Sequence, residues 1–434
     1  MISNKKISYS LLIILFAVFT FTGCKKDEGF KHANGAAMTI EDFTAKQGGG
    51  GTVVLITGSN FTTDTTQIAV TINGKKLAVV GANGNQVMAV VPKKCGSGNI
   101  VVKVGADSAV STGIFNYVFT RTVTTLAGNG TAGFANGEGV DAMFKFHDYR
   151  CGLTVDDNLN VYVADAGNHC IRKITPDGVV STLAGSPEGA GYSDGTGSGA
   201  KFQTPFDVAV DAAGNVYSVD PWNWDIRKIT PDGIATTIGW SIGSGPFCIG
   251  IDKLNGNIYY TAHDAGKINR LLPDGTNATI IEGLAWPADI TVDKDHNLFI
   301  VLHDIAQIGK FTADTWTQTI IAGQENAYGY KNGPGATAQF SSPWGIGINS
   351  DGGLYIAGNG NQGGDPNNPD QSIRYITPGT WNVSTFSGSG TSGYAEGVGD
   401  AAAFNAPTGV AVDKNGTVYV LDRNNNRIRK IVSE

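Results

Sequence analysis

Aromatic side chains beside Asp, Asn and His are the residues of this 434-residue sequence with the clearest potential chemistry. The sharpest cluster is Pro221-Trp222-Asn223-Trp224, because turns rarely carry two indoles. An indole stacks on the apolar face of a sugar ring, while planar amides and carboxylates bind its hydroxyl groups. The cluster therefore predicts a carbohydrate-binding surface. The competing interpretation is that one or both indoles pack beneath a neighbouring long loop.

Histidines and carboxylates suggest a second chemistry, a metal-dependent reaction. His263-Asp264 and His303-Asp304 occupy equivalent places in adjacent repeats. A catalytic metal needs three converging ligands and one open position. The sequence has no H-x-x-H spacing, and both pairs are expected to lie outside the central channel. We therefore predict no metal, no cofactor and no catalytic residue.

Two further motifs favour a structural role. Residues 128–133 and 388–393 spell G-x-G-x-x-G after a strand, but no βαβ unit follows that could deliver a pyrophosphate. Four cysteines match no metal or disulfide spacing. They are expected to be buried thiols: Cys95, Cys151, Cys170 and Cys248.

The elements that position these residues are copies of one four-strand unit. Residues 152–185 hold four β-branched runs separated by turn residues, and the pattern returns at 207–239 and 409–434. The shortest distance between units is 41 residues. Such a period with four strands per unit is typical of a β-propeller, here with six blades. The first strand of each unit ends in Asp or Asn, at Asp156, Asp211, Asp252, Asp293, Asn349 and Asp413.

The two ends of the repeat region are expected to close this propeller. The last unit stops after its third strand, near Val432, and an orphan fourth strand at residues 123–128 precedes the first complete unit. We predict that the orphan strand completes the sixth blade, because the blade would otherwise expose an unpaired edge.

One face of the propeller is expected to bind the ligand. The connections between blades are long and variable, and they share a face with the loops between the second and third strands of each blade. Phe206, Phe247 and Trp344 could instead plug the axis. The predicted ligand contacts are Arg150, Phe206, Asp207, Trp222, Asn223, Trp224, His263, Asp289, His303 and Trp344.

The start of the chain indicates export. Lys5 and Lys6 precede an apolar run at residues 11–21 that is too short to span a membrane as a mature helix. The run ends in FTGC, residues 21–24, which resembles a bacterial lipobox and implies cleavage before Cys24 and lipid attachment to it. The following KKDE resembles the tag of Gram-negative lipoproteins on the outer face of the outer membrane. Ordinary secretion and a periplasm-facing position are the alternatives.

The composition of the chain limits the expected fold class and the expected kinds of partner. The net charge of -7 disfavours nucleic acid and anionic lipid surfaces as partners. Sixty glycines and 16% charged residues suit a turn-dense all-β protein.

Two family resemblances define the expected domains. The runs GGGT (49–52), ITGSNF (56–61) and VP (91–92) resemble IPT/TIG domains, and the Asn73-Gly74 hairpin signal agrees with an immunoglobulin-like sandwich. The runs NVYVAD (160–165), GVAVD (409–413) and NNRIRKI (425–431) resemble NHL repeats. We expect a signal peptide at 1–23, a tether at 24–36, an IPT/TIG domain at 37–120 and a six-bladed NHL-repeat propeller at 121–434.

The predicted function is non-catalytic binding at the bacterial surface. The leading hypothesis is a lipoprotein in the outer membrane that binds a polysaccharide beside an uptake system. A scaffold for a surface protein is the alternative, because the resemblance to NHL propellers implies protein partners. A metal-dependent lyase or lactonase is the third hypothesis.

Overall fold

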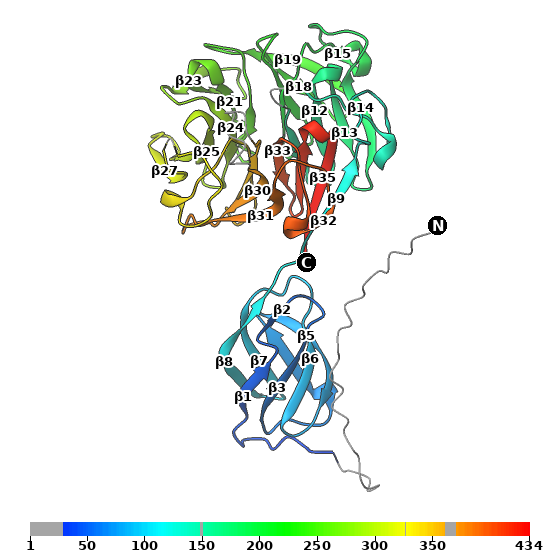
Figure 1. Cartoon of the computed structure of the whole chain (residues 1–434), viewed down its shortest axis with the longest axis vertical. Coiled ribbons are helices and arrows are strands. Elements are labelled where there is room, and N and C mark those ends of the chain that lie inside the picture. The colour runs from blue at the N-terminus through cyan, green and yellow to red at the C-terminus, as the bar shows by residue number, and fades with distance from the viewer. Residues whose placement is uncertain (1–28, 148–150, 326, 361–369) are drawn as a thin grey trace, which may run out of the picture. The chain divides into compact units, whose positions relative to one another are not determined.

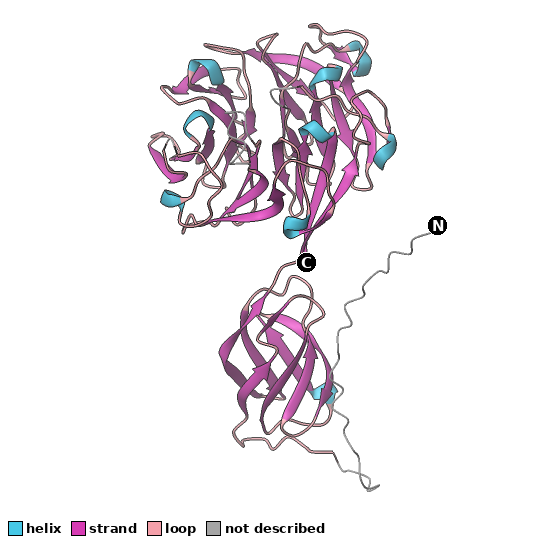
Figure 2. Cartoon of the chain, in the orientation of Figure 1, coloured by secondary structure: helices cyan, strands magenta, loops and turns pink. Residues whose placement is uncertain are grey.

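The computed structural model describes residues 29–147, 151–325, 327–360 and 370–434. The chain forms two compact units, divided between Val118 and Phe119. Both are built from strands, with helices of a single turn (Figure 2). No helix in the described ranges combines the length and apolar composition that crossing a membrane requires. The predicted signal peptide, Cys24 and Arg150 lie outside the described residues.

The N-terminal unit, blue to cyan in Figure 1, is an immunoglobulin-like sandwich. Its strands join in the order β1-β3-β6-β5-β4-β7-β8-β2 around an apolar core. The predicted Asn73-Gly74 turn connects β4 to β5, and both residues have the positive φ that favours Asn and Gly there. The elements are β1 (Thr39–Thr44), β2 (Gln47–Gly48), β3 (Val53–Ser59), η1 (Thr65–Gln67), β4 (Ile68–Ile72), β5 (Lys75–Ala82), β6 (Gln86–Val90), β7 (Gly98–Val104) and β8 (Asp107–Tyr117).

The C-terminal unit is a six-bladed β-propeller, as predicted. Each blade is an antiparallel meander whose strands we call a to d from the axis outward. Blades 1 to 3 are β11 (Leu153–Val155), β12 (Val161–Asp165), β13 (Cys170–Ile174), β14 (Val179–Gly185); β16 (Asp207–Val210), β17 (Val216–Asp220), β18 (Asp225–Ile229), β19 (Ile234–Trp240); and β20 (Ile249–Ile251), β21 (Ile258–Ala262), β22 (Lys267–Leu271), β23 (Asn277–Ile281).

Blades 4 to 6 repeat the arrangement. They are β24 (Pro287–Val292), β25 (Leu298–Leu302), β26 (Gln307–Phe311), β27 (Gln318–Ala322); β28 (Pro343–Ile348), β29 (Leu354–Gly358), β30 (Gln371–Ile376), β31 (Val383–Gly390); and β33 (Pro407–Val412), β34 (Val418–Asp422), β35 (Arg427–Ser433), β9 (Arg121–Ala127). Single helical turns occupy four b–c loops: η3 (Ala166–Asn168), η5 (His263–Ala265), η6 (His303–Ile305) and η9 (Arg423–Asn425).

The ring closes as the sequence predicts. Strand β9 pairs antiparallel with β35, and Val123 lies opposite Ile431. The backbone N–H groups of Thr120 and Glu434 each donate to the other residue's carbonyl, at 2.8 and 2.9 Å. The first and last strands of the propeller are therefore neighbours in blade 6, and the edges that they turn toward each other are paired.

The aspartates that mark the repeats are turn residues. The carboxylate of Asp156 accepts the backbone N–H groups of Asn158 and Asn160 and the hydroxyl of Tyr162. Asp413 binds its own turn and Tyr419 in the same way. Each carboxylate thus fixes its a–b turn, which explains why the residue type recurs.

Four of the six blades bury an arginine on strand c between two aromatic rings. In blade 6 the guanidinium carbon of Arg429 lies 4.8 Å from the Tyr394 ring centroid and 5.4 Å from that of Phe404. It also pairs with the buried Asp422 at 2.8 Å. The equivalent arginines and their ring pairs are Arg172 with Phe134 and Phe144, Arg227 with Tyr192 and Phe202, and Arg374 with Tyr330 and Phe340.

The long connections between blades supply these aromatic pairs, which lie ten residues apart in each connection. The connections fold back along the outer d strands instead of serving only as binding loops. Backbone carbonyls in them also accept from the buried arginines, as Ala395 and Ala403 do from Arg429. Their elements are β10 (Gly137–Glu138), η2 (Gly139–Asp141), β15 (Gly195–Thr196), η4 (Gly197–Gly199), η7 (Gly335–Thr337), β32 (Gly397–Val398) and η8 (Gly399–Ala401).

Replacing one buried arginine should destabilise the propeller severely. Arg429→Ala leaves the buried carboxylate of Asp422 without its ion-pair partner, so we expect the free energy of unfolding to fall by about 3–5 kcal/mol. Chemical denaturation measures this loss. Lys430→Ala, at the partly exposed neighbouring position, is the control and should cost less than about 0.5 kcal/mol. Equal stabilities of the two variants would contradict a structural role for the buried guanidinium.

Candidate functional site

The central channel and the predicted binding face lie on opposite sides of an aromatic layer. The channel contains a cavity of about 430 Å³ lined by the a strands of all six blades. Residues of the a–b turns, including Asp157, Lys253 and Lys414, border the cavity at one end. Asp207 and Asp289, at or near the start of their a strands, border it at the other. The cavity therefore belongs to the a–b side of the propeller.

Four rings cross the propeller axis at the start of the a strands, and we call them the axial cluster. Phe206 meets Phe247 edge to face, with ring centroids 5.1 Å apart. Phe247 stacks on His263 at 4.4 Å, and the ring of His263 lies parallel to that of Trp344 at 6.3 Å. Because blades 2, 3 and 5 contribute these rings, the cluster spans the axis. It separates the cavity from the predicted binding face.

Two half-exposed tryptophans pack on this cluster, and a third, Trp224, lies two residues along the chain from one of them; we call the three the tryptophan face. Trp222 packs on Phe206 at 4.9 Å, and Trp286 packs on His263 at 4.8 Å. The exposed fractions of Trp222, Trp224 and Trp286 are 51%, 46% and 49%. Neither Trp222 nor Trp224 is buried beneath a loop, so both indoles present surface to solvent.

The segment from Pro221 to Trp224 is held by a buried carboxylate. Asp220 ends strand β17 and accepts the backbone N–H groups of Gln203 and Thr204 at 2.6 and 2.9 Å. The side-chain amide of Asn223 donates to Asp220 and to the carbonyl of Gly191. Burial raises the pKa of Asp220. Asn223, a predicted ligand contact, therefore secures the loop, while its two tryptophan neighbours project from it.

Trp286 was not among the sequence-predicted contacts. It immediately precedes β24, and its carbonyl accepts the backbone N–H of His303 at 3.1 Å. Its backbone has φ 45°, in the left-handed region that bulky residues rarely adopt. The available signal was its place directly before Pro287, which aligns with the prolines that precede Phe206, Phe247 and Trp344. It was missed because blades 3 and 4 are the most divergent repeats.

Five of the predicted ligand contacts are buried, and the structure gives them supporting roles. Phe206 and Trp344 plug the axis, which was the alternative interpretation. His263 was expected outside the channel but lies within the axial cluster, because η5 turns its ring inward between Phe247 and Trp344. The last two, Asp207 and Asp289, accept backbone N–H groups of neighbouring blades.

His303 is partly exposed and supports the edge of the cluster. Its Nδ1 lies 2.9 Å from the carbonyl oxygen of Pro343, and its ring lies 4.5 Å from that of Trp344. His303 of blade 4 is thereby tied to the first strand of blade 5. The histidine of blade 3 is tied instead to its neighbour, with Nδ1 of His263 2.9 Å from Asp264. The two histidines are not equivalent in their partners.

One group of potential metal ligands occurs among the described residues. Oxygen and sulfur atoms of Asp207, Cys248 and Asp289 lie within 4.8 Å of one another, and all three residues are buried. The carboxylate of Asp207 accepts from Ile249 at 3.1 Å, and that of Asp289 accepts from Ile346 at 2.9 Å. These carboxylates join blade 2 to blade 3 and blade 4 to blade 5, so their geometry is that of inter-blade links. Like Cys248, the three other predicted thiols are buried.

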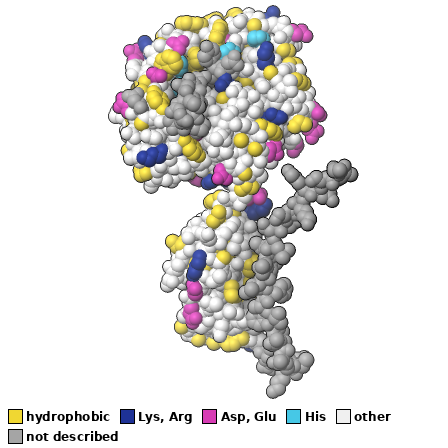
Figure 3. Space-filling view, in the orientation of Figure 1, with side chains coloured by type: hydrophobic (Ala, Val, Ile, Leu, Met, Phe, Trp, Pro, Cys, Tyr) yellow, Lys and Arg dark blue, Asp and Glu magenta, His cyan; other side chains and the backbone are white. Residues whose placement is uncertain are grey.

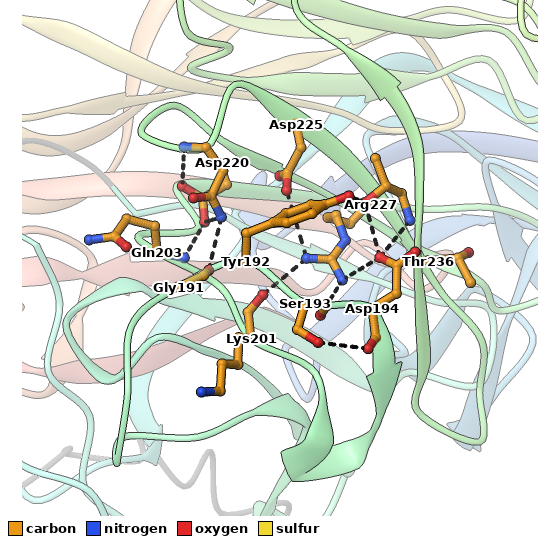
Figure 4. A network of polar contacts seen from close by, with 12 residues as sticks. Gly191, Tyr192, Ser193, Asp194, Lys201, Gln203, Asp220, Asp225, Arg227 and Thr236 are labelled. Carbon is orange, nitrogen blue, oxygen red and sulfur yellow. Dashed lines mark hydrogen bonds and ion pairs between the residues drawn. The ribbon is translucent and has the colours of Figure 1, made fainter.

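A second buried carboxyl group follows the tryptophan loop directly. Asp225 begins strand β18 and pairs across the ladder with Asp220. Its nearest cation is Arg227, with an Nη1–Oδ2 distance of 3.7 Å. Figure 4 shows Asp225 beside Arg227, with Tyr192 over the guanidinium. Burial, reinforced by the negative charge of Asp220, raises the pKa of Asp225 to about 7.

This carboxyl group should make stability depend on pH. The folded chain keeps the Asp225 proton to a higher pH than the unfolded chain, whose ordinary value is 3.8. The resulting penalty is absent below about pH 4, grows as the pH rises to about 7, and is complete above that, at up to about 4 kcal/mol. Asp225→Asn should therefore raise the melting temperature at pH 8 and change it little at pH 4. An equal shift at both pH values would contradict this assignment.

Comparisons with known proteins agree with both units. The model of the IPT/TIG domain family matches residues 38–120, and the model of the NHL repeat matches residues 152–174 and 404–431. Protein SUPPRESSOR OF QUENCHING 1 of Arabidopsis thaliana is 26% identical over 71% of this chain and 27% of its own length. NHL repeat-containing protein 2 of Gallus gallus is 26% identical over 64% of this chain and 38% of its own. The chain thus spans between a quarter and two fifths of these relatives.

Solved structures share the fold over nearly the whole chain. A Bacteroides thetaiotaomicron protein of unknown function has 20% identity and a TM-score of 0.64, covering 93% of this chain and 100% of its own. An auxiliary nutrient binding protein of the same species has 23% identity and a TM-score of 0.59, covering 93% and 99%. A second protein so named, from Bacteroides ovatus, has 22% identity and a TM-score of 0.58, covering 93% and 100%.

Proposed function

We propose that this protein, an IPT/TIG domain followed by an NHL-repeat propeller, is a non-catalytic binding protein of the bacterial cell surface whose tryptophan face binds a glycan. This proposal depends on one observation, which is that half-exposed indoles pack on the axial cluster. Rings supported from behind keep their orientation, so a sugar can stack on them without the entropy loss of ordering them first.

The shape of the site supports binding of an extended ligand. Trp222 and Trp286 lie half-exposed on the aromatic layer, whereas small-molecule sites are concave and enclose most of their ligand. Figure 3 shows hydrophobic side chains spread over the visible side of the propeller, with Lys/Arg and Asp/Glu groups among them. A neutral polymer can lie across the tryptophan face and touch several indoles at once.

The names of the structural relatives support the same class of function. Two of them are auxiliary nutrient binding proteins, and they share the fold over both units. A nutrient polysaccharide is one kind of ligand that such a protein would present to an uptake system. Binding without a reaction fits the described site, because the carboxylates of Asp207, Asp220 and Asp289 accept backbone N–H groups and the histidines support aromatic rings.

Removing an indole should weaken glycan binding. We expect Trp222→Ala and Trp286→Ala each to weaken affinity by up to about tenfold, because stacking contributes about 0.5–1.5 kcal/mol beyond the area buried. Affinity electrophoresis of the protein without its signal peptide, in gels containing starch, xylan, galactomannan or arabinogalactan, would reveal the ligand. Calorimetry would then measure the losses.

Leu254→Ala is the matched control, because Leu254 is 69% exposed and borders the cavity on the a–b side. This variant should bind like the parent. Failure of the parent to bind any polysaccharide of a broad panel would overturn the glycan proposal. Equal loss in Leu254→Ala would move the site to the other side of the propeller.

We also propose that Cys24 carries a lipid anchor and that the protein faces the cell exterior. Cys24→Ala should move the protein from the membrane fraction to the soluble fraction of a Gram-negative host, because the thiol that receives the lipid is absent. Protease treatment of intact cells tests the orientation, and it should digest the parent. Retention of the variant in the membrane fraction would contradict lipid attachment at this residue.

A further inference from the structure

Blade 2 has an unusual pair of residues on either side of the loop that connects strand b to strand c. The last residue of b faces the first residue of c across the ladder, and in blade 2 both are aspartates, Asp220 and Asp225. Like charges directly opposite each other are destabilising. The corresponding pairs in blades 1, 3, 4 and 6 are Asp165 with Cys170, Ala262 with Lys267, Leu302 with Gln307 and Asp422 with Arg427.

The cation in blade 2 is already engaged. Arg227 donates to the carbonyls of Lys201 and Ser193 and forms an ion pair with Asp194 at 2.9 Å. In blades 1 and 6 the equivalent arginine instead binds the aspartate that ends strand b, at 2.7 and 2.8 Å. Neither carboxyl oxygen of Asp225 has a hydrogen-bond partner within the described structure, and the residue is fully buried.

The groups that face Asp225 come from three segments. Asp220 lies across the ladder on β17, Arg227 lies two residues along β18, and Asp194 belongs to the connection that covers the blade (Figure 4). Strand β19 places Trp240 opposite Asp225. Two of the three charged neighbours are therefore negative, and the one positive neighbour is shared.

Asp225 is also coupled to the loop that carries the tryptophans. Trp224 directly precedes it, and the Trp224 carbonyl accepts the backbone N–H of Ser241 at 2.8 Å. Trp224 has φ 63°, a left-handed conformation that must be held by its surroundings. A change in the position of Asp225 would therefore act first on Trp224 and on the end of β19.

We propose that Asp225 is a proton-operated switch for the tryptophan face, in which the neutral carboxyl group keeps the segment from Pro221 to Trp224 in its binding conformation and the ionised group releases it. The switch rests on the proposed binding function only for its consequence, which is that glycan affinity falls as the pH rises. The pKa of Asp225, raised by burial to about 7, places the transition near neutrality. An ionised carboxylate at this position must gain water or move outward, because burial without a partner is costly.

Tryptophan fluorescence tests the switch without any ligand. The full folded chain should show an emission change with a midpoint near pH 7, and Asp225→Asn should abolish it. Trp224→Phe should reduce its amplitude, because the released loop carries that indole. His147 needs a control because its ring lies 5.6 Å from that of Trp222, and histidine is the side chain whose ordinary pKa lies near neutrality. His147→Gln should leave the transition in place.

Three outcomes would overturn the switch. They are the absence of a transition in the parent chain, its persistence in Asp225→Asn, and its loss in His147→Gln but not in Asp225→Asn. Asp225→Asn can be checked for folding by its melting curve, and Asp194→Asn is a second variant that should lower the midpoint by removing a negative neighbour.

The consequence for binding is measured on the polysaccharide that the panel identifies. Affinity should fall by up to about tenfold per pH unit above the midpoint, the limit for one linked proton, and should stay level in Asp225→Asn. Constant affinity beside a fluorescence transition would overturn the coupling to the ligand. A fluorescence transition in a protein that binds no polysaccharide would leave the switch in place and refute the glycan proposal instead.

Discussion

A guanidinium buried in a β-sheet requires the surrounding chain to supply acceptors, a counter-charge and apolar cover, and this requirement organises most of the propeller. Arg172, Arg227, Arg374 and Arg429 are fully buried. Each takes backbone carbonyls and two rings from the connection that precedes its blade. A connection that wraps its own blade cannot also extend over the axis. The long connections before blades 1, 2, 5 and 6 therefore pack against the outer side of the propeller.

Blades 3 and 4 lack this requirement, and Trp286, one of the three indoles of the tryptophan face, lies where it is absent. Asn269 and Gly309 stand where the other blades have arginine. Asn269 needs only the carbonyl of Ile242, from a short connection. With no wrapped loop to accommodate, the connection before blade 4 can present Trp286 to solvent against His263. The exposure of Trp286 is thus consistent with the absence of the buried cation from blades 3 and 4.

The repeat pattern was sufficient to predict the six blades and the closing pair β9–β35, because these depend on local periodicity and on an unpaired edge. The Asn73-Gly74 hairpin signal and the resemblance to IPT/TIG domains predicted the immunoglobulin-like unit. The axial cluster could not be predicted residue by residue. The approach of His263 to Trp344 joins blades 3 and 5 and depends on how the ring closes. The sequence contains the aromatic pairs ten residues apart that enclose each buried arginine. Their role could be recognised only once strand c was known to bury its arginine. Asp225 aligns with Cys170, and only the spatial pairing with Asp220 gives its carboxyl group significance.

Exposed indoles and an unbalanced buried carboxyl group are both costly for folding, and here they are neighbours. Trp222 and Trp224 keep about half of their surface in water, and Trp224 holds a left-handed backbone conformation. The four residues from Pro221 to Trp224 carry the tryptophans between two buried acids, Asp220 and Asp225. The remaining blades show that the fold does not need this arrangement, since Cys170 or Gln307 occupies the same place without a second acid. A local departure that lowers stability and leaves the scaffold intact is expected where binding, and not folding, determines the residues. On that ground we propose that the functional centre of the propeller is the junction of blade 2 with blades 3 and 4.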